Sequence, residues 1–157
     1  MTHRKLIIAV IGSHQCDENT AKIAQQLGRE IAKIGAILVC GGLGGVMEAV
    51  AKGAKENSGI TVGILPGENK NEANPYIDIP IATGLGYTRN TLVTTAADIV
   101  VALAGEYGTL SEISFALNAK KPVIGIKTWD IKGIIKVNTV KEVMQEIKRI
   151  IISNIVH

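Results

Sequence analysis

Short, uninterrupted runs of apolar residues recur along this chain, and segments with helical periodicity separate them. Leu6–Ile11 is such a run, and Ile23, Leu27 and Ile31 follow it at helical spacing. A strand that is apolar on both faces is typical of a parallel sheet with helices on both sides. The alternation continues without a break in composition. It predicts one doubly wound α/β domain over residues 1–157, with a mainly parallel sheet.

The same reasoning gives the approximate limits of each element. The expected strands are Leu6–Ile11, Ile37–Cys40, Ile60–Leu65, Ile77–Ala82, Ile99–Leu103 and Val123–Ile126. The expected helices run from Asp17 to about Ile34 and over Val46–Lys55, Thr88–Ala97, Leu110–Asn118 and about Thr139–Ile152. Pro80 has no backbone N–H, so the strand that contains it is expected to be short or at a sheet edge. The stretch around Trp129–Gly133 is expected to be less regular.

Composition excludes several classes of function. The net charge of +3 comes from scattered lysines and arginines, which argues against a nucleic-acid partner. Aromatic residues make up only 3% of the chain, which leaves little material for stacking bases. Cys16 and Cys40 are too few for a disulfide framework and indicate reduced thiols in a cytoplasmic protein. The sequence shows no metal-ligand spacing, no signal peptide and no membrane-spanning segment.

Two glycine-rich turns follow expected strands and lead into expected helices. The first is Gly41-Gly42-Leu43-Gly44-Gly45, and the second, Gly105-Glu106-Tyr107-Gly108-Thr109, is expected to start its helix at Thr109. A helix N-terminus offers free N–H groups and the positive end of a dipole to an anion. Such turns also simply permit close packing of a helix on a strand. Their recurrence favours a phosphate-bearing ligand, and right-handed crossovers place both at one sheet edge, beside Gly12-Ser13.

Glu112 has two compatible interpretations. As a functional residue, it lies beside a ribose or a water molecule as a general base or as a stabiliser of an oxocarbenium ion. As a structural residue, it completes a capping box with Thr109, in which its carboxylate accepts a hydrogen bond from the Thr109 N–H.

Arg89 and Asn90 lie at the expected start of the helix over Thr88–Ala97. A cation is unfavourable at that end of a helix, so Arg89 is expected to have an anionic partner, either a ligand phosphate or a carboxylate such as Glu112. The alternative is a solvated surface arginine. His14 is expected to be an exposed loop residue, and a Glu106 carboxylate within an anion-binding turn must point away from the phosphate.

Taken together, these motifs resemble the Rossmann-like "lysine decarboxylase-like" superfamily. The resemblance is carried by Gly41–Ala49, Gly84-Leu85-Gly86-Tyr87-Thr88-Arg89-Asn90 and Gly105–Glu112. The superfamily contains the LONELY GUY phosphoribohydrolases and the molybdenum cofactor carrier proteins. Leu65-Pro66-Gly67 and Ala73-Asn74-Pro75 are closer to the carrier branch. A DNA-processing protein of natural transformation is a more distant relative by fold.

The resemblance implies a binding protein for a nucleotide-like, phosphate-bearing ligand, with the molybdenum cofactor as a candidate and no cofactor required. The alternative is a hydrolase that cleaves the N-glycosidic bond of nucleoside 5′-monophosphates, with Arg89 and Glu112 as the catalytic pair. Ala104, Glu106 and Asn90 depart from the hydrolase pattern. The resemblance also implies a homo-oligomer, a dimer or a tetramer, for which the apolar C-terminal helix could supply the interface. The expected ligand-binding residues are Gly12, Ser13, Gly41, Gly42, Gly44, Gly45, Arg89, Asn90, Gly105, Gly108 and Thr109.

Overall fold

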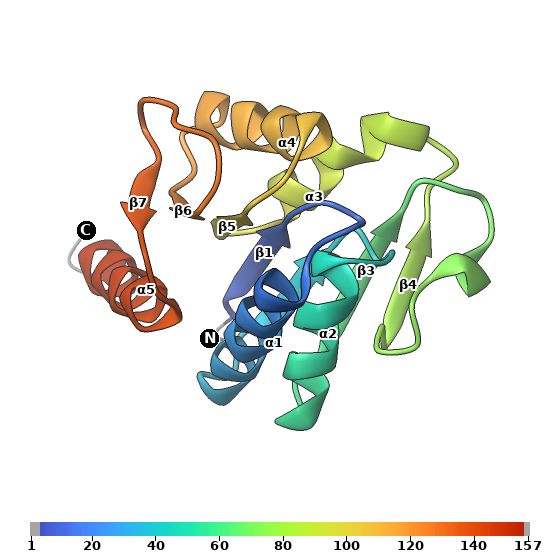
Figure 1. Cartoon of the computed structure of the whole chain (residues 1–157), viewed down its shortest axis with the longest axis horizontal. Helices are drawn as coiled ribbons and strands as arrows, with labels where there is room; N and C mark the ends of the chain where they lie inside the picture. Colours follow the sequence, from blue (N-terminus) through green and yellow to red (C-terminus); the bar gives the residue numbers. More distant parts are fainter. Residues whose placement is uncertain (1–3, 156–157) are drawn as a thin grey trace.

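A seven-stranded parallel sheet forms the centre of residues 4–155, which the computed structural model describes (Figure 1). The strand order is β4-β3-β2-β1-β5-β6-β7, and every neighbouring pair is parallel. The strands are β1 (Ile7–Ile11), β2 (Ile37–Cys40), β3 (Thr61–Leu65), β4 (Ile79–Ala82), β5 (Ile99–Leu103), β6 (Val123–Ile126) and β7 (Ile135–Val137).

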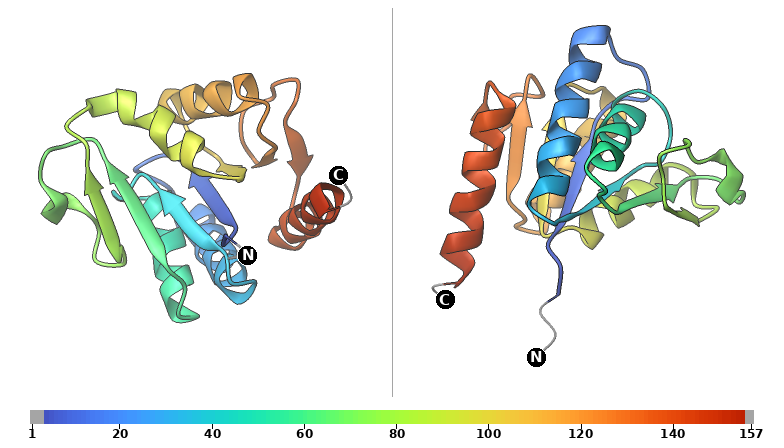
Figure 2. Two further views of the ribbon diagram at one scale, coloured as in Figure 1. Left: turned by 180° about the vertical axis from the view of Figure 1, so that it is seen from behind. Right: turned by 90° about the horizontal axis from the view of Figure 1, so that it is seen from below.

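Helices cover both faces of this sheet. The helices are α1 (Glu18–Lys33), α2 (Val46–Glu56), α3 (Asn90–Ala96), α4 (Tyr107–Asn118) and α5 (Val140–Ile155), with short 3-10 turns η1 (Lys70–Glu72) and η2 (Gly86–Arg89). α1, α2 and α5 lie on one side and α3 and α4 on the other (Figures 1 and 2). Because each face is covered, the core divides into two apolar clusters, one on each side of the sheet. The prediction of a doubly wound α/β fold is confirmed.

Most elements begin and end within two residues of the expected limits; the start of α4 and the end of α5 lie three residues outside the expected ranges. β4 is indeed an edge strand, with Pro80 in register with Gly63. β7 at the opposite edge was not predicted, because three residues carry too short a pattern. α4 begins at Tyr107 and not at Thr109, since the turn at Ala104 (φ 49°) and Gly105 (φ 103°) redirects the chain earlier.

The strand order reverses between β1 and β5, and this point positions the site. The chain moves outward from β1 through β2 to β4 on one side, and then from β5 to β7 on the other. Ile11 at the end of β1 is in register with Ala102 of β5, so the loops after these two strands begin side by side. Ligands of such sheets bind at this switch point.

None of the helices within residues 4–155 combines the length and the apolar character that a bilayer span requires.

Candidate functional site

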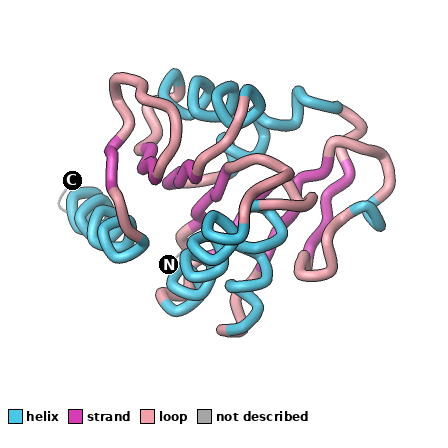
Figure 3. The backbone as a smooth tube through the Cα atoms, in the orientation of Figure 1, coloured by secondary structure: helices cyan, strands magenta, loops and turns pink. Residues whose placement is uncertain are grey.

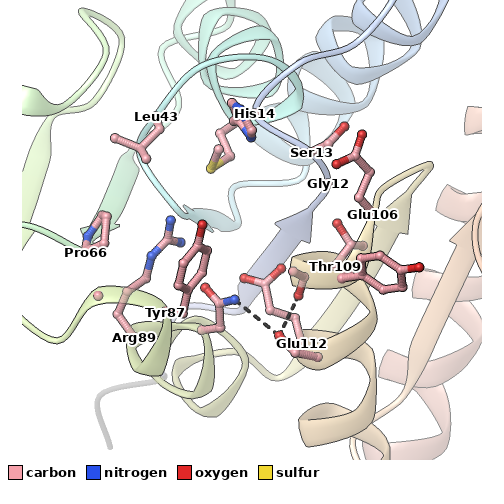
Figure 4. Close-up of a pocket in the computed structure, with 16 residues that line it drawn as sticks. Gly12, Ser13, His14, Leu43, Pro66, Tyr87, Arg89, Glu106, Thr109 and Glu112 are labelled. Atoms are coloured by element: carbon pink, nitrogen blue, oxygen red, sulfur yellow. Dashed lines mark hydrogen bonds between the residues drawn. The ribbon is translucent and has the colours of Figure 1, made fainter.

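A pocket of about 810 Å³ lies at the carboxyl ends of the strands, at the switch point (Figure 4). The loops that follow β1 and β2 lie next to each other at the carboxyl edge of the sheet (Figure 3) and line one side of the pocket. η2, α3 and the start of α4 line the other side of the pocket. The lining residues are Gly12, Ser13, His14, Leu43, Met47, Pro66, Gly86, Tyr87, Arg89, Asn90, Glu106, Tyr107, Gly108, Thr109, Ser111 and Glu112.

The structure brings together most of the residues singled out from the sequence, but not all. The predicted residues that line the pocket are Gly12, Ser13, Arg89, Asn90, Gly108, Thr109 and Glu112. The predicted residues that are not among its lining are Gly41, Gly42, Gly44, Gly45 and Gly105. His14 is exposed, as expected, and also reaches the pocket.

The N-terminus of α4 opens into the pocket with unpaired backbone donors. Its N-cap is Glu106, whose side chain makes no capping hydrogen bond. The first N–H with a partner is that of Leu110, which donates to the Glu106 carbonyl at 3.0 Å. Within residues 4–155, no partner is found for the N–H groups of Tyr107, Gly108 and Thr109. Three free donors at the positive end of a helix form a ready site for an anion.

The predicted capping box does not form. Because α4 begins two residues before Thr109, both Thr109 and Glu112 lie inside the helix. Thr109 is 3% exposed and Glu112 is 6% exposed. No hydrogen bond to the Glu112 carboxyl group is found among the described residues, so the structural interpretation of this carboxylate is wrong, and its chemical interpretation stays a prediction.

Arg89 is buried at the point where η2 meets α3. Arg89 is 8% exposed, and its Nε is a buried polar atom with no hydrogen-bond partner in the described part of the chain. The guanidinium packs against the backbone of Gly41, where a Cβ would lie 3.0 Å from Cζ of Arg89. A side chain at position 41 would collide with the Arg89 guanidinium, which explains the glycine there. The alternative of a solvated surface arginine is wrong.

Arg89 and Glu112 affect each other across the pocket without forming an ion pair. No contact within 4.0 Å joins them in the described part of the chain. Burial raises the pKa of Glu112 to about 8, although the nearby Arg89 opposes the shift. Burial also lowers the pKa of Arg89 from its ordinary value, and Glu112 partly offsets that shift. At neutral pH the pocket thus contains a guanidinium and a largely neutral carboxylic acid.

Asn90 is held by a short chain of hydrogen bonds. Its Nδ2 donates to Ser111 Oγ at 3.2 Å, and Ser111 Oγ donates to the Gly108 carbonyl at 2.6 Å (Figure 4). These bonds join the start of α3 to the first turn of α4. Asn90 therefore holds the two helix starts together at the pocket.

The turn over Gly41–Gly45 has a different role from the turn before α4. Gly45 (φ 63°) lies against the backbone of Ser13 and His14, and a Cβ there would overlap both residues. The Val46 N–H at the start of α2 already donates to the Ser13 carbonyl at 3.0 Å. Gly44 and Gly45 let the loop after β1 approach closely, while Leu43 next to them reaches the pocket.

Several pocket residues lie in the motifs that carry the resemblance but were not among the expected ligand-binding residues. Leu43, Met47 and Pro66 contribute apolar wall from separate loops, and Tyr87 and Tyr107 contribute rings. Apolar residues next to glycine turns look like packing residues until the loops are placed in space. Among residues 4–155, no group of three or more His, Cys, Asp or Glu side chains could hold a metal ion.

Comparisons with known proteins agree with this architecture. The model of the SLOG cluster4 family matches residues 5–155. An uncharacterised protein of Archaeoglobus fulgidus is 48% identical over 120 residues, which cover 76% of this chain and 79% of that protein.

Solved structures extend the comparison. The molybdenum cofactor binding protein of Rippkaea orientalis is 37% identical, with a TM-score of 0.90 over 96% of this chain and 99% of that one. The Moco carrier protein of Chlamydomonas reinhardtii is 36% identical, with a TM-score of 0.87 over 96% of this chain and 99% of that one. DNA processing protein A of Streptococcus pneumoniae is only 18% identical over 90% of this chain and 62% of that one, with a TM-score of 0.73, and shares the fold alone.

Proposed function

The chain belongs to the SLOG cluster4 family, and from this premise we propose that it binds a phosphate-bearing, nucleotide-like ligand and carries it unchanged, with the molybdenum cofactor as the leading candidate. Its resemblance to the molybdenum cofactor carrier branch is established by the comparisons. In this proposal the cofactor is cargo, and the residues of the pocket hold it.

The observation that carries the proposal is the unpartnered Nε of buried Arg89. Leaving a charged donor buried without an acceptor costs about 1–3 kcal/mol or more, so such a group usually has a partner. Arg89 lines the pocket, and so do Tyr107, Gly108 and Thr109 at the start of α4, whose N–H groups have no partner within residues 4–155. A phosphate or another oxyanion in the pocket supplies acceptors for the three N–H groups and an opposite charge for the Arg89 guanidinium.

Glu112 fits the same ligand. With a pKa of about 8, it is mostly protonated at neutral pH and does not repel an anion. A protonated carboxyl group also donates a hydrogen bond. Arg89 and a neutral Glu112 together therefore favour an anionic ligand over a cationic one.

The second candidate function is hydrolysis of nucleoside 5′-monophosphates. The observation in its favour is that Arg89 and Glu112 line one pocket with Thr109. Its weakness is the protonation state, because a carboxylate that stabilises an oxocarbenium ion must be ionised. A pKa of about 8 keeps most of Glu112 neutral near pH 7.

Calorimetry with molybdopterin and with AMP tests the carrier proposal. We expect Arg89→Ala to weaken binding about 10- to 100-fold, which is the range for hydrogen bonds to a charged group. The matched control is Arg149→Ala on α5, where the arginine is paired with Glu146 on the exposed face, and it should leave the affinity unchanged. Failure of both compounds to bind would refute the proposal.

The same samples separate carriage from hydrolysis. Wild-type protein is incubated with AMP at pH 7 and pH 9, and free adenine is measured. A carrier releases no base at either pH. Base release that disappears in Glu112→Gln would establish the hydrolase instead.

A further inference from the structure

Aromatic side chains are scarce in this chain, yet most of them gather at the pocket. The sequence contains one Phe, one Trp and three Tyr. Tyr87 and Tyr107 line the pocket, and Trp129 contacts Tyr107. The low aromatic content argued against stacking when only the composition was considered. In the folded chain, the few available rings are concentrated at one place.

These two tyrosines are exposed in a way that leaves ring surface free. Tyr87 is 89% exposed and Tyr107 is 80% exposed. The Tyr107 ring is supported by Trp129, with ring centroids 6.0 Å apart and an interplanar angle of 34°. Trp129 is in turn held by its Nε1, which donates to the Glu106 carbonyl at 3.2 Å. Trp129 therefore supports the Tyr107 ring on one side, and the rest of the ring is open to the pocket.

Glu106 directly precedes Tyr107 in the chain and lines the same pocket (Figure 4). Its side chain is exposed, does not cap α4, and has no hydrogen-bond partner among the described residues. A carboxylate next to an anion-binding helix start is unfavourable unless donors from the ligand reach it. The two oxygens of a carboxylate match two adjacent N–H groups, as a carboxylate does for an arginine.

We propose that Glu106, Tyr87 and Tyr107 form the specificity site for the ring of the ligand, and that this ring is an amino-pyrimidinone, as in guanine and the pterins. The inference rests on the proposed function, because it takes the phosphate to lie at the start of α4. The ring lies at the pocket mouth against Tyr107. The adjacent ring N–H and exocyclic amino group donate to the Glu106 carboxylate, an arrangement that adenine, which lacks this pair of donors, does not offer.

Calorimetry with GMP, AMP, ribose 5-phosphate and molybdopterin tests the proposal. Stacking on an aromatic side chain is worth about 1–3 kcal/mol, so we expect GMP and molybdopterin to bind at least about tenfold more tightly than ribose 5-phosphate. AMP should bind less tightly than GMP and more tightly than ribose 5-phosphate. Trp129 is the one tryptophan of the chain, and its fluorescence gives a second readout that should change with the ring-bearing compounds only.

Variants assign the two contributions. Tyr107→Leu keeps apolar bulk but loses the flat face, and should weaken GMP and AMP alike by about tenfold, whereas Tyr107→Phe should not. Glu106→Gln should remove the preference for GMP over AMP, and ribose 5-phosphate, which has no ring donors, should bind somewhat more tightly because a negative charge beside the phosphate is removed. The background control is Glu18→Gln on α1, whose side chain is 84% exposed.

The outcomes distinguish this inference from the function on which it rests. Equal affinity for GMP and AMP, unchanged by Glu106→Gln, would overturn the role of Glu106. Equal affinity for GMP and ribose 5-phosphate would overturn the role of the rings, while Arg89-dependent binding of all probes would leave the phosphate site intact. If no probe binds at all, the proposed function itself fails, and the inference fails with it.

Discussion

Single residues in this site are explained by what lies against them. Gly41 has no side chain because the Arg89 guanidinium occupies that space, and Gly45 has none because the Ser13–His14 backbone does. Cys40, directly beneath, is fully buried, and burial raises the pKa of its thiol to about 11. Its thiol donates to the Met47 carbonyl, with Sγ 3.8 Å from the oxygen. It is a packing residue with a neutral thiol.

Glu112 gives a pH-dependent prediction at this scale. Folding raises its pKa from 4.5 to about 8, so the folded state holds the proton more tightly than the unfolded state. The folded state therefore loses stability as the pH rises through that interval. Glu112→Gln cannot ionise and escapes this loss. We expect it to gain stability over the wild type between pH 5 and pH 9, by a few kcal/mol at about 1.4 kcal/mol per pKa unit.

Thermal unfolding of both proteins across this pH range provides the measurement. Glu18→Gln gives the background for the same chemical change at an exposed position. Parallel curves for wild type and Glu112→Gln would show that the buried carboxyl group ionises freely in the folded protein.

At the scale of elements, the start of α4 decides what the site can bind. Gly105 has φ 103°, and a Cβ there would overlap the side chain of Thr109. Gly105→Ala combines backbone strain with a collision, so we expect a loss of stability of about 1–3 kcal/mol together with weaker phosphate binding. Chemical denaturation and calorimetry measure the two effects.

Gly35→Ala is the matched control for that substitution. Gly35 also has a positive φ, 75°, but nothing lies within 4 Å of its Cβ position. It should therefore lose about 1 kcal/mol from strain alone and keep full ligand affinity. Equal effects of the two substitutions on binding would show that the α4 turn does not position the ligand.

How far these elements could be predicted from the sequence depends on the kind of signal. Buried strands such as β1 and β5 were predicted because a run of apolar residues is evident in the sequence alone, without knowledge of what packs against it. β7 was missed because Ile135–Val137 is short and only half-buried. The start of α4 was misplaced because Thr109 and Glu112 imitate a capping box, whereas the chain turns earlier, at Ala104 and Gly105.

The site divides in the same way. Arg89, Asn90, Thr109 and Glu112 were found because a cation at a helix start or a glycine turn with a nearby acid is chemically unusual. Tyr87, Tyr107 and Leu43 were missed because an aromatic or aliphatic side chain has the same sequence signature in a core and in a pocket wall. Only the switch point between β1 and β5 brings these loops together.

At the scale of the whole molecule, the two faces of the sheet differ in the charge of the elements that cover them. α3, α4 and β4 carry one charged side chain between them, Glu112, which is buried in the pocket. The same face exposes Leu92 (39%) and Phe115 (43%), and α3 and α4 leave part of the sheet uncovered beside β4, where Ile79 (49%) and Ile81 (45%) are exposed. An uncharged, apolar surface of this kind is typical of a protein interface.

We expect a second copy of this chain to cover that face. Because α3, α4 and β4 carry no exposed charged side chain, they can meet their own copy across a two-fold axis without like-charge repulsion between these elements. The alternative is the C-terminal helix considered in the sequence analysis, where Ile152 is 63% exposed. α5 also carries lysines, glutamates and an arginine, which suit a solvated helix better than an isologous contact.

Light scattering after gel filtration decides between the two faces. Wild-type protein should be a dimer or a larger oligomer, and the double variant Leu92→Glu, Phe115→Glu should be a monomer, because each copy places two buried charges in the contact. Ile152→Glu should leave the assembly intact. Both side chains in the double variant are at least one third exposed in the single chain, so the monomer should keep its fold, which circular dichroism checks.

A wild-type monomer, or dissociation only by Ile152→Glu, would contradict the assignment. Dissociation by the double variant with Arg89-dependent binding retained would show that each copy contains a complete pocket.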